Sequence, residues 1–138
     1  KVLKRFVIDC SVVMAWCFVD EADEYADSVL DMLASAEAVA PSIWALEVAN
    51  VLLVGERRNR LKEADSARFI ELLRELHITA DNETADHALR EILSIGRVQG
   101  LSSYDAAYLE LAMRHGLALA TRDNALRRAA KKFGVRLI

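Results

Sequence analysis

The 138-residue chain is long enough to bury a hydrophobic core, and we expect residues 1–138 to form a single domain. Its hydrophobic content of 54% is slightly high, so we expect another chain to cover part of its apolar surface. The formal charge of −3 excludes a protein that coats nucleic acid by bulk charge alone, and no apolar run reaches the roughly 18 residues that span a bilayer. Residues 1–5 lack the apolar core of a signal peptide, so we expect a cytoplasmic protein, trimmed of its initiating Met, with no membrane partner.

Short apolar runs alternate along the chain with longer segments of helical period. In chain order the pattern predicts a strand at 6–9, a short helix after it, a helix at 22–35, a strand at 38–40, helices at 42–57 and 63–75, a strand at 77–80, helices at 82–98 and 103–115, a strand at 117–120, a helix at 123–133 and a strand at 135–138. Asp81 or Asn82 is expected to cap the helix at 82–98, and Gly116 to end the helix before it reaches the strand at 117–120. This alternation predicts an α/β fold with a parallel sheet, helices on both faces and a ligand site beyond the carboxyl ends of the strands.

The cysteines and histidines are not spaced as zinc ligands. Cys10 and Cys17 lie seven residues apart, and the histidines are scattered at 77, 87 and 115. We expect both cysteines to pack as small hydrophobic residues, without zinc, haem or thiol chemistry.

Asp9 directly follows the first predicted strand. A carboxylate buried at a strand end is costly unless something pairs with it, which favours a functional role. Asp9 followed by Ser11 also suits a helix start, so an N-cap is an equal alternative.

Glu47 interrupts an otherwise apolar helical segment. At helical spacing it shares a face with Ile43, Asn50, Val51 and Val54. An ionised Glu on such a face needs a cation, a metal ion or a raised pKa, and Asn50 is placed to orient it or bind its water. The alternative is a Glu at the edge of the apolar arc that reaches solvent.

Asp105 and Asp123 are explained locally as helix-capping residues. With Ser102 as N-cap, Asp105 falls in the first turn and complements the helix dipole. Asp123, with Thr121 and Asn124 beside it, can cap the helix at 123–133.

The joint placement of the four acids indicates more than capping. Three of them lie at a strand end or at the start of the helix after one, and a doubly wound sheet can bring all four to one edge. Clustered carboxylates raise one another's pKa, so a stable cluster needs cations. Oxygen ligands without Cys or His favour Mg²⁺ or Mn²⁺, and the matching chemistry is metal-assisted phosphoryl transfer.

At these same residues the sequence resembles the PIN-domain family, and specifically the VapC toxins of bacterial and archaeal toxin–antitoxin pairs. The resemblance is carried by the segments FVIDCSV at 6–12, EVAN at 47–50, SYDA at 103–106 and LATRD at 119–123. Each motif is weak alone, but the four in this order span essentially the whole chain. The resemblance implies a PIN-like three-layer α/β/α sandwich with a central, mostly parallel five-stranded sheet.

The resemblance also implies the activity and the partners. It implies a Mg²⁺- or Mn²⁺-dependent endoribonuclease that hydrolyses RNA with activated water, forms a homodimer and is blocked by a VapB-like antitoxin. The family's acidic quartet and its supporting polar positions match Asp9, Glu47, Asp105 and Asp123, and Ser11, Asn50 and Thr121. Asp9 and Asp105 are assigned as the most direct metal ligands. Glu47 is assigned as a ligand or as the residue that orients water, and Asp123 as acting through water or on a second ion.

Basic and aromatic residues suggest where partners bind. Arg122, near the acids, and the basic stretch at Arg57, Arg58 and Arg60 are expected to contact RNA, although such runs also serve as solvated surface. Candidates for an apolar groove that receives an antitoxin segment are Trp16, Phe18 and Trp44, with core packing as the alternative. Tyr108 is assigned to the core or to the dimer interface.

Other α/β proteins with acids at strand ends fit less well. A receiver domain needs adjacent acids after its first strand, and a haloacid-dehalogenase-type phosphatase needs Asp-x-Asp there, whereas Asp9 is followed by Cys10 and Ser11. The remaining alternative is a catalytically silent PIN-like module that binds RNA or acts as a scaffold.

Overall fold

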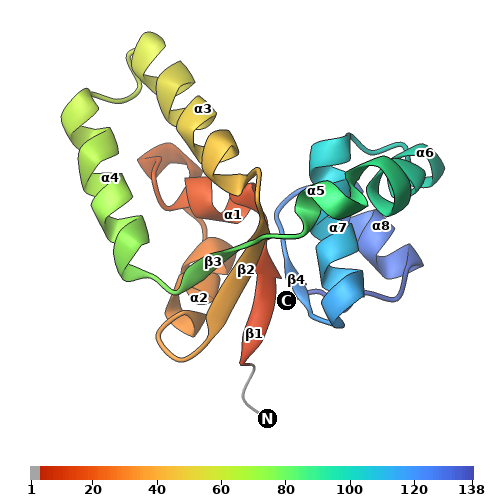
Figure 1. The fold of residues 1–138 in the computed structure, drawn as a ribbon. Coiled ribbons are helices and arrows are strands. Elements are labelled where there is room, and N and C mark those ends of the chain that lie inside the picture. The colour runs from red at the N-terminus through yellow and green to blue at the C-terminus, as the bar shows by residue number, and fades with distance from the viewer. Residues whose placement is uncertain (1–3) are drawn as a thin grey trace.

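The computed structural model describes residues 4–138 and consists of a parallel sheet with helices on both sides (Figure 1). In chain order the elements are β1 (Arg5–Ile8), α1 (Cys10–Ala15), the 3₁₀ turn η1 (Val19–Glu21), α2 (Glu24–Met32), β2 (Glu37–Pro41), α3 (Trp44–Arg57), α4 (Glu63–Glu75), β3 (Ile78–Asp81), α5 (Thr84–His87), the π-helical turn η2 (Ala88–Ile92), α6 (Leu93–Gln99), α7 (Ser103–His115), β4 (Leu119–Ala120) and α8 (Asn124–Lys132). The predicted α/β class is confirmed.

The sheet has four strands in the order β3-β2-β1-β4, all parallel. The segment at 135–138, expected to be a fifth strand, lies beside β4 but forms only a single parallel bridge, between Leu119 and Leu137. Leu119 N–H donates to the Arg136 carbonyl at 2.9 Å, and Ile138 N–H donates to the Leu119 carbonyl at 3.0 Å. Because β4 is only two residues long, it offers too little backbone for a fifth full strand.

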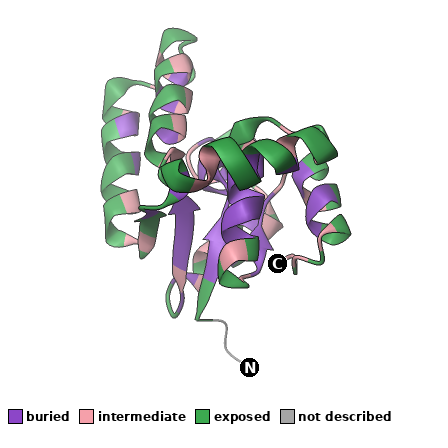
Figure 2. Cartoon of the chain, turned by 45° about the vertical axis from the view of Figure 1, so that its right-hand side comes forward, coloured by how far each residue is buried: buried purple, intermediate pink, exposed green. Residues whose placement is uncertain are grey.

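Successive side chains of β1 point to opposite faces of the sheet, so β1 contributes to a hydrophobic core on each face. Phe6 and Ile8 pack with residues of α1, α2 and α3, whereas Val7 packs with residues of α7 and α8. In Figure 2 the central strands are mostly buried and the outer faces of the helices are exposed, whereas the edge strand β3 is largely exposed. The three-layer sandwich is therefore confirmed.

The predicted helix at 82–98 is divided into α5, η2 and α6, and neither Asp81 nor Asn82 caps it. The N-cap position is Glu83, which makes no capping hydrogen bond through its side chain. Asp81 is instead the buried last residue of β3, and its carboxylate accepts from Thr84 and from Arg114. Gly116 does end α7, with a positive φ of 63° that favours glycine.

Helices α3 and α4 run side by side and project beyond the sheet (Figure 1). The longest helix of residues 4–138 is α3, with 14 residues, and none in this range is long and apolar enough to cross a membrane.

Candidate active site

The four acids meet at the carboxyl-terminal edge of the sheet. Asp9 follows β1 and Asp123 follows β4, while Glu47 and Asp105 lie in the first turns of α3 and α7. They are close enough for their charges to interact, since Asp9 raises the pKa values of both Glu47 and Asp105. The expected clustering from four separate segments is present in the structure.

Asp9 is buried and held by two hydroxyl groups. It is 5% exposed, and its Oδ2 accepts from Ser11 Oγ at 2.6 Å and from Thr121 Oγ1 at 2.8 Å. Burial raises the pKa of Asp9, the two hydroxyls counteract that rise, and the charge of Asp123 adds to it. Asp9 occupies the N-cap position of α1, but its side chain makes no capping hydrogen bond, so capping does not explain it.

Glu47 is half-buried and directed toward the other acids. Tyr108 donates its hydroxyl hydrogen to Glu47 Oε1 across 2.5 Å. Burial raises the pKa of Glu47, the Tyr108 hydrogen bond opposes the rise, and the charges of Asp9 and Asp105 strengthen it. Glu47 is therefore not simply a surface side chain, because its carboxylate is hydrogen-bonded to a buried residue. Asn50, one turn further along α3, is exposed.

Asp105 combines a cap position with a carboxylate that faces the cluster. Its backbone N–H donates to Ser102 Oγ at 3.1 Å, so Ser102 is the expected N-cap of α7. Burial, followed by the charges of Asp9 and Asp123, raises the pKa of the Asp105 carboxyl to about 6. The backbone N–H of Asp105 thus takes part in capping α7, while its carboxylate belongs to the acidic cluster.

Asp123 is also an N-cap, as expected, and it is linked to Asp9. Its Oδ1 accepts from the Leu126 N–H at 2.9 Å, which caps α8. Its own N–H donates to Thr121 Oγ1 at 3.0 Å, and this same hydroxyl donates to Asp9. Thr121 is fully buried, so it fixes two acids relative to each other.

The negative charge of the cluster is not balanced by the chain itself. Within residues 4–138, the salt bridges include none of the four acids. Arg122 instead pairs with Asp23 at 2.8 Å, and Arg60 pairs with Asp20 and Glu21. A cluster of this kind repels itself unless a cation from outside occupies it.

The donor set fits a hard divalent cation better than a soft one. Carboxylate and hydroxyl oxygens surround the cluster, and they are the ligands of Mg²⁺ and Mn²⁺. The neighbouring Cys10 thiol is a poor ligand because burial, followed by the charges of Glu47 and Asp9, raises its pKa to about 12. In the described part of the chain, no three His, Cys, Asp or Glu side chains are already close enough together to hold a metal ion.

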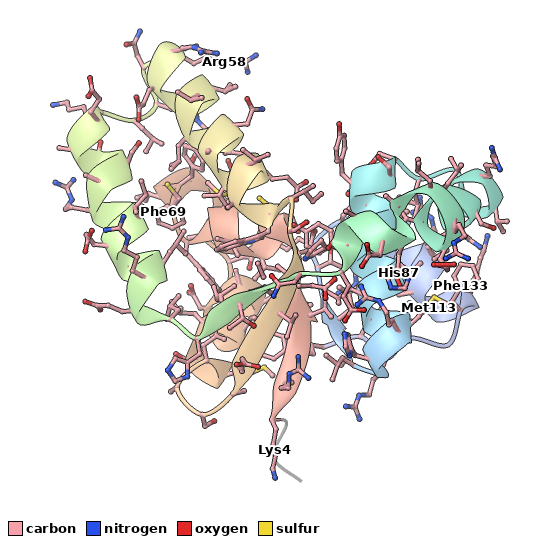
Figure 3. The ribbon with its side chains drawn as sticks, in the orientation of Figure 1. Lys4, Arg58, Phe69, His87, Met113 and Phe133 are labelled. Atoms are coloured by element: carbon pink, nitrogen blue, oxygen red, sulfur yellow. The ribbon has the colours of Figure 1, made fainter. Side chains whose placement is uncertain are left out.

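The other basic residues named from the sequence lie away from the acids or are engaged elsewhere. Arg57 and Arg58 are exposed at the far end of α3, where Figure 3 labels Arg58. Arg60 stacks on Phe18, 4.1 Å from the ring centroid, in addition to its ion pairs. Arg122 touches the site at Ser11, where its backbone N–H donates to Ser11 Oγ at 3.1 Å and its guanidinium donates to the Ser11 carbonyl at 3.5 Å.

Two further residues, Arg127 and Tyr108, lie beside the acids. Arg127 donates to the Thr121 carbonyl at 2.9 Å. Tyr108 was expected to be in the core or at an interface; it is fully buried, but its hydroxyl holds Glu47. Its position one turn after Asp105 was the available signal, because residues three apart share a helix face.

Three comparisons relate this geometry to known proteins. Residues 6–132 match the model of the PIN domain. The chain is 30% identical over 129 residues to Ribonuclease VapC3 of Pyrobaculum aerophilum, with 94% of this chain and 95% of that protein covered. Its fold is similar to the crystal structures of PAE2754 from Pyrobaculum aerophilum (TM-score 0.69, 21% identity, 97% and 90% of the two chains) and of VapBC2 from Rickettsia felis bound to a promoter DNA fragment (TM-score 0.64, 16% identity, 97% of both chains).

Proposed function

The chain belongs to the PIN-domain family, and from that membership we propose that it is a metal-dependent endoribonuclease, the toxin of a type II toxin–antitoxin pair. The observation that carries the proposal is the cluster of four carboxylates, which forms no salt bridge with any cation of residues 4–138. Similarity to Ribonuclease VapC3 over most of both chains supports RNA as the substrate. We take residues 1–138 as a single PIN domain that acts in the cytoplasm.

The four acids would share the binding of Mg²⁺ or Mn²⁺. Asp9 and Asp105 are the proposed direct ligands, since Asp9 is rigidly held and the Asp105 carboxylate is not committed to capping. Glu47 is proposed to ligate the ion or to orient the attacking water. Asp123 keeps one oxygen on the α8 cap, which leaves the other for a second ion or a bridging water.

The chain's own residues prepare the site for hydrolysis. Ser11 and Thr121 hold the Asp9 carboxylate in place, which avoids reorganisation when a phosphate arrives. Bound Mg²⁺ or Mn²⁺ would lower the pKa of water and offset the charge that develops on the phosphate. Attack by water on the phosphodiester leaves a 5′-phosphate and a 3′-hydroxyl and does not need the 2′-hydroxyl as nucleophile.

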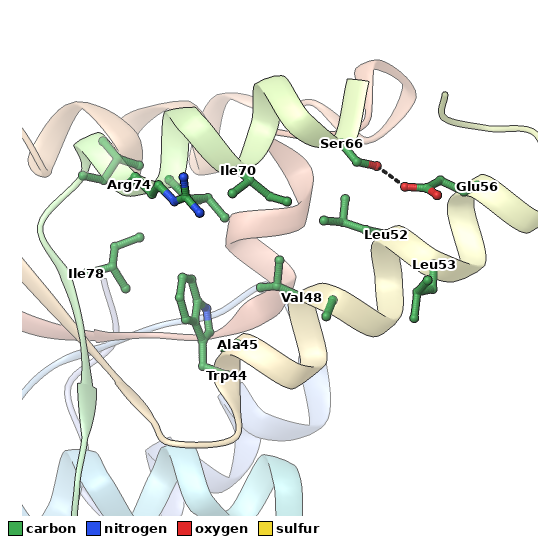
Figure 4. Close-up of a pocket in the computed structure, with 13 residues that line it drawn as sticks. Trp44, Ala45, Val48, Leu52, Leu53, Glu56, Ser66, Ile70, Arg74 and Ile78 are labelled. Atoms are coloured by element: carbon green, nitrogen blue, oxygen red, sulfur yellow. Dashed lines mark hydrogen bonds between the residues drawn. The ribbon is translucent and has the colours of Figure 1, made fainter. Parts of the chain in front are cut away.

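We propose that a VapB-like antitoxin segment docks in the groove between α3 and α4. Figure 4 shows this groove, of about 600 Å³, with Val48, Leu52 and Ile70 along its walls. Trp44 lies at one end, and its buried Nε1–H has no hydrogen-bond partner among the described residues, so a bound backbone carbonyl could accept from it. Trp16 and Phe18 line a second pocket, but Phe18 is buried and Trp16 already donates to the Ala26 carbonyl.

The groove is apolar enough to suit an amphipathic segment, and Arg74 and Glu56 at its margin provide charges for orientation. We propose that exposed apolar residues outside the groove, such as Leu46, Leu89 and Val98, contribute to a homodimer interface.

The direct test of the function is cleavage of a single-stranded RNA with Mg²⁺, with EDTA, and by the Asp9→Asn variant. We expect cleavage by the wild type only with the metal ion, and at least 100-fold slower cleavage by Asp9→Asn, whereas Asp27→Asn on the exposed surface of α2 should match the wild type. Equal cleavage in all samples would indicate a contaminating nuclease. RNA binding without cleavage would support the silent RNA-binding module instead.

A further inference from the structure

Tyr108 connects the two sides of the molecule at the acidic cluster. Its ring is fully buried in the core formed with α6 and α8, whereas Glu47 belongs to α3 on the other side of the sheet. The Tyr108 hydroxyl and Glu47 Oε1 are 2.5 Å apart, although the residues are 61 positions apart in the sequence.

The hydrogen bond is the kind that fixes a carboxylate. A distance of 2.5 Å lies at the short end of the range for a hydroxyl that donates to a charged oxygen. A buried phenol without an acceptor is unfavourable, so Tyr108 and Glu47 hold each other in place. Burial, together with the hydrogen bond to Glu47, keeps the pKa of the Tyr108 hydroxyl far above its usual value, so the hydroxyl remains a donor.

Two of the other acids are held by hydrogen bonds that do not involve Tyr108. Asp9 is held by two hydroxyl groups and Asp123 by a backbone N–H. Glu47 has a longer side chain with more rotatable bonds, and within residues 4–138 the Tyr108 hydroxyl is the one hydrogen-bond partner of its carboxylate.

We propose that Tyr108 is a positioning residue: it holds Glu47 Oε1 so that the remaining carboxylate oxygen, Oε2, is directed to the cation that the four acids bind. The proposal rests on the proposed function. Tyr108 itself is fully buried and touches neither RNA nor the reacting atoms.

The test compares Tyr108→Phe with Tyr104→Phe. Both changes remove one phenolic hydroxyl from α7, but Tyr104 is 59% exposed and serves as the matched control. Titration of Mn²⁺ followed by calorimetry should show about 10–100-fold weaker binding for Tyr108→Phe, as is usual when the partner of a metal ligand is removed. The kcat for RNA cleavage should fall with the KM for RNA unchanged, and Tyr104→Phe should match the wild type in both measurements.

A double variant separates positioning from packing. If Tyr108 acts through Glu47, then Tyr108→Phe in the Glu47→Gln background should change Mn²⁺ affinity less than threefold. An equal loss in both backgrounds, or a Tyr108→Phe variant that binds Mn²⁺ like Tyr104→Phe, would overturn the proposal. A wild type that neither binds Mn²⁺ nor cleaves RNA would instead overturn the proposed function and this inference with it.

A measurement on the unmodified chain covers the case in which Tyr108→Phe does not fold. With ¹³Cζ-labelled tyrosine, the Tyr108 resonance should shift as Mg²⁺ saturates the site, because Glu47 redistributes its charge toward the ion. A Tyr108 resonance that stays in place at saturation would contradict the proposal.

Discussion

At the scale of single residues, the same acid often serves both the fold and the site. The Asp123 carboxylate caps α8 with Oδ1, and the Asp105 backbone N–H completes the cap at Ser102. A local role therefore does not argue against a catalytic one, because a carboxylate has two oxygens and each residue also has a backbone. The two roles of Asp123 can be separated by substitution.

The two roles of Asp123 should respond differently to Asn and Ala. Asp123→Asn keeps a good N-cap, so we expect little change in the free energy of unfolding, whereas Asp123→Ala should lose about 1 kcal/mol. Both should cleave RNA at least tenfold more slowly, because both remove the charge. Urea unfolding and a cleavage assay check this; an Asp123→Asn variant with full activity would reduce Asp123 to a cap.

The raised pKa of Asp105 makes the metal-free chain sensitive to pH. In the folded chain the Asp105 pKa is about 6, above the usual value of an Asp side chain, so the folded state binds more protons than the unfolded state between the two values. The protonated Asp105 carboxyl therefore contributes fully to the free energy of unfolding below about pH 4, and this contribution is lost as the pH rises through about 6. Asp105→Asn should raise the Tm of the metal-free chain by roughly 3–6 °C at pH 7.5 and leave it unchanged at pH 4.

Added Mg²⁺ provides the control for this prediction. It should raise the Tm of the wild type at pH 7.5 and have a weaker effect on Asp105→Asn, since ligand binding to the folded state stabilises it. An Asp105→Asn variant that is less stable than the metal-free wild type at pH 7.5 would contradict the repulsive cluster.

At the scale of elements, the sequence predicts what depends on local pattern. The bounds of α4 and α7 agree with the prediction, because capping residues and apolar spacing define both. The segment at 135–138 was expected to be a strand, but strand formation also depends on how much of β4 is available to pair. The Tyr108–Glu47 hydrogen bond depends on how α3 and α7 approach each other, which no local pattern encodes.

A buried ion network ties α7 to the end of β3. The Arg114 guanidinium donates to Asp81 Oδ2 at 2.7 Å and to Glu110 Oε2 at 2.8 Å, and it lowers the pKa of Asp81. Arg114→Met removes the guanidinium that pairs with two buried carboxylates and should cost about 3 kcal/mol at pH 7. Because the folded-state pKa of Asp81 is lowered, the cost should shrink as the pH falls through that pKa.

Arg74→Met gives the matched control, since Arg74 forms an exposed pair with Glu71 and should change the Tm little. Thermal unfolding at pH 7 and pH 4 checks both variants. Equal melting of Arg114→Met and the wild type at pH 7 would show that the network does not stabilise the fold.

At the scale of the whole molecule, the acids lie where the two helical layers meet. Glu47 comes from the layer with α1–α4, Asp105 from the layer with α5–α8, and Asp9 and Asp123 from the ends of the strands between them. The site forms only when both layers pack on the sheet, which is why each acid remained ambiguous in the sequence. The apolar groove between α3 and α4 has Trp44 at one end, three residues before Glu47, so that end lies near this junction (Figure 4).

Antitoxin binding in the α3–α4 groove should be separable from RNA cleavage at the acidic cluster. Leu53→Glu places a charge on its wall and should weaken the binding of the cognate antitoxin by at least tenfold while RNA cleavage continues. Ser28→Glu, on the exposed surface of α2 and outside the groove, should bind the antitoxin like the wild type. Calorimetry with the purified antitoxin measures both. Undiminished binding by Leu53→Glu would place the antitoxin elsewhere.

The most direct test of the acidic cluster is calorimetric titration of Mn²⁺ at pH 7.5 into the wild type and into Asp9→Asn. Asp9 is the most buried of the four acids. Its charge acts on Glu47 and Asp105, and the Thr121 hydroxyl connects it to Asp123, so its charge should be essential to the site. We expect saturable binding by the wild type and at least tenfold weaker binding by Asp9→Asn. Absent binding by the wild type, or equal binding by both, would contradict a metal site built from these four acids.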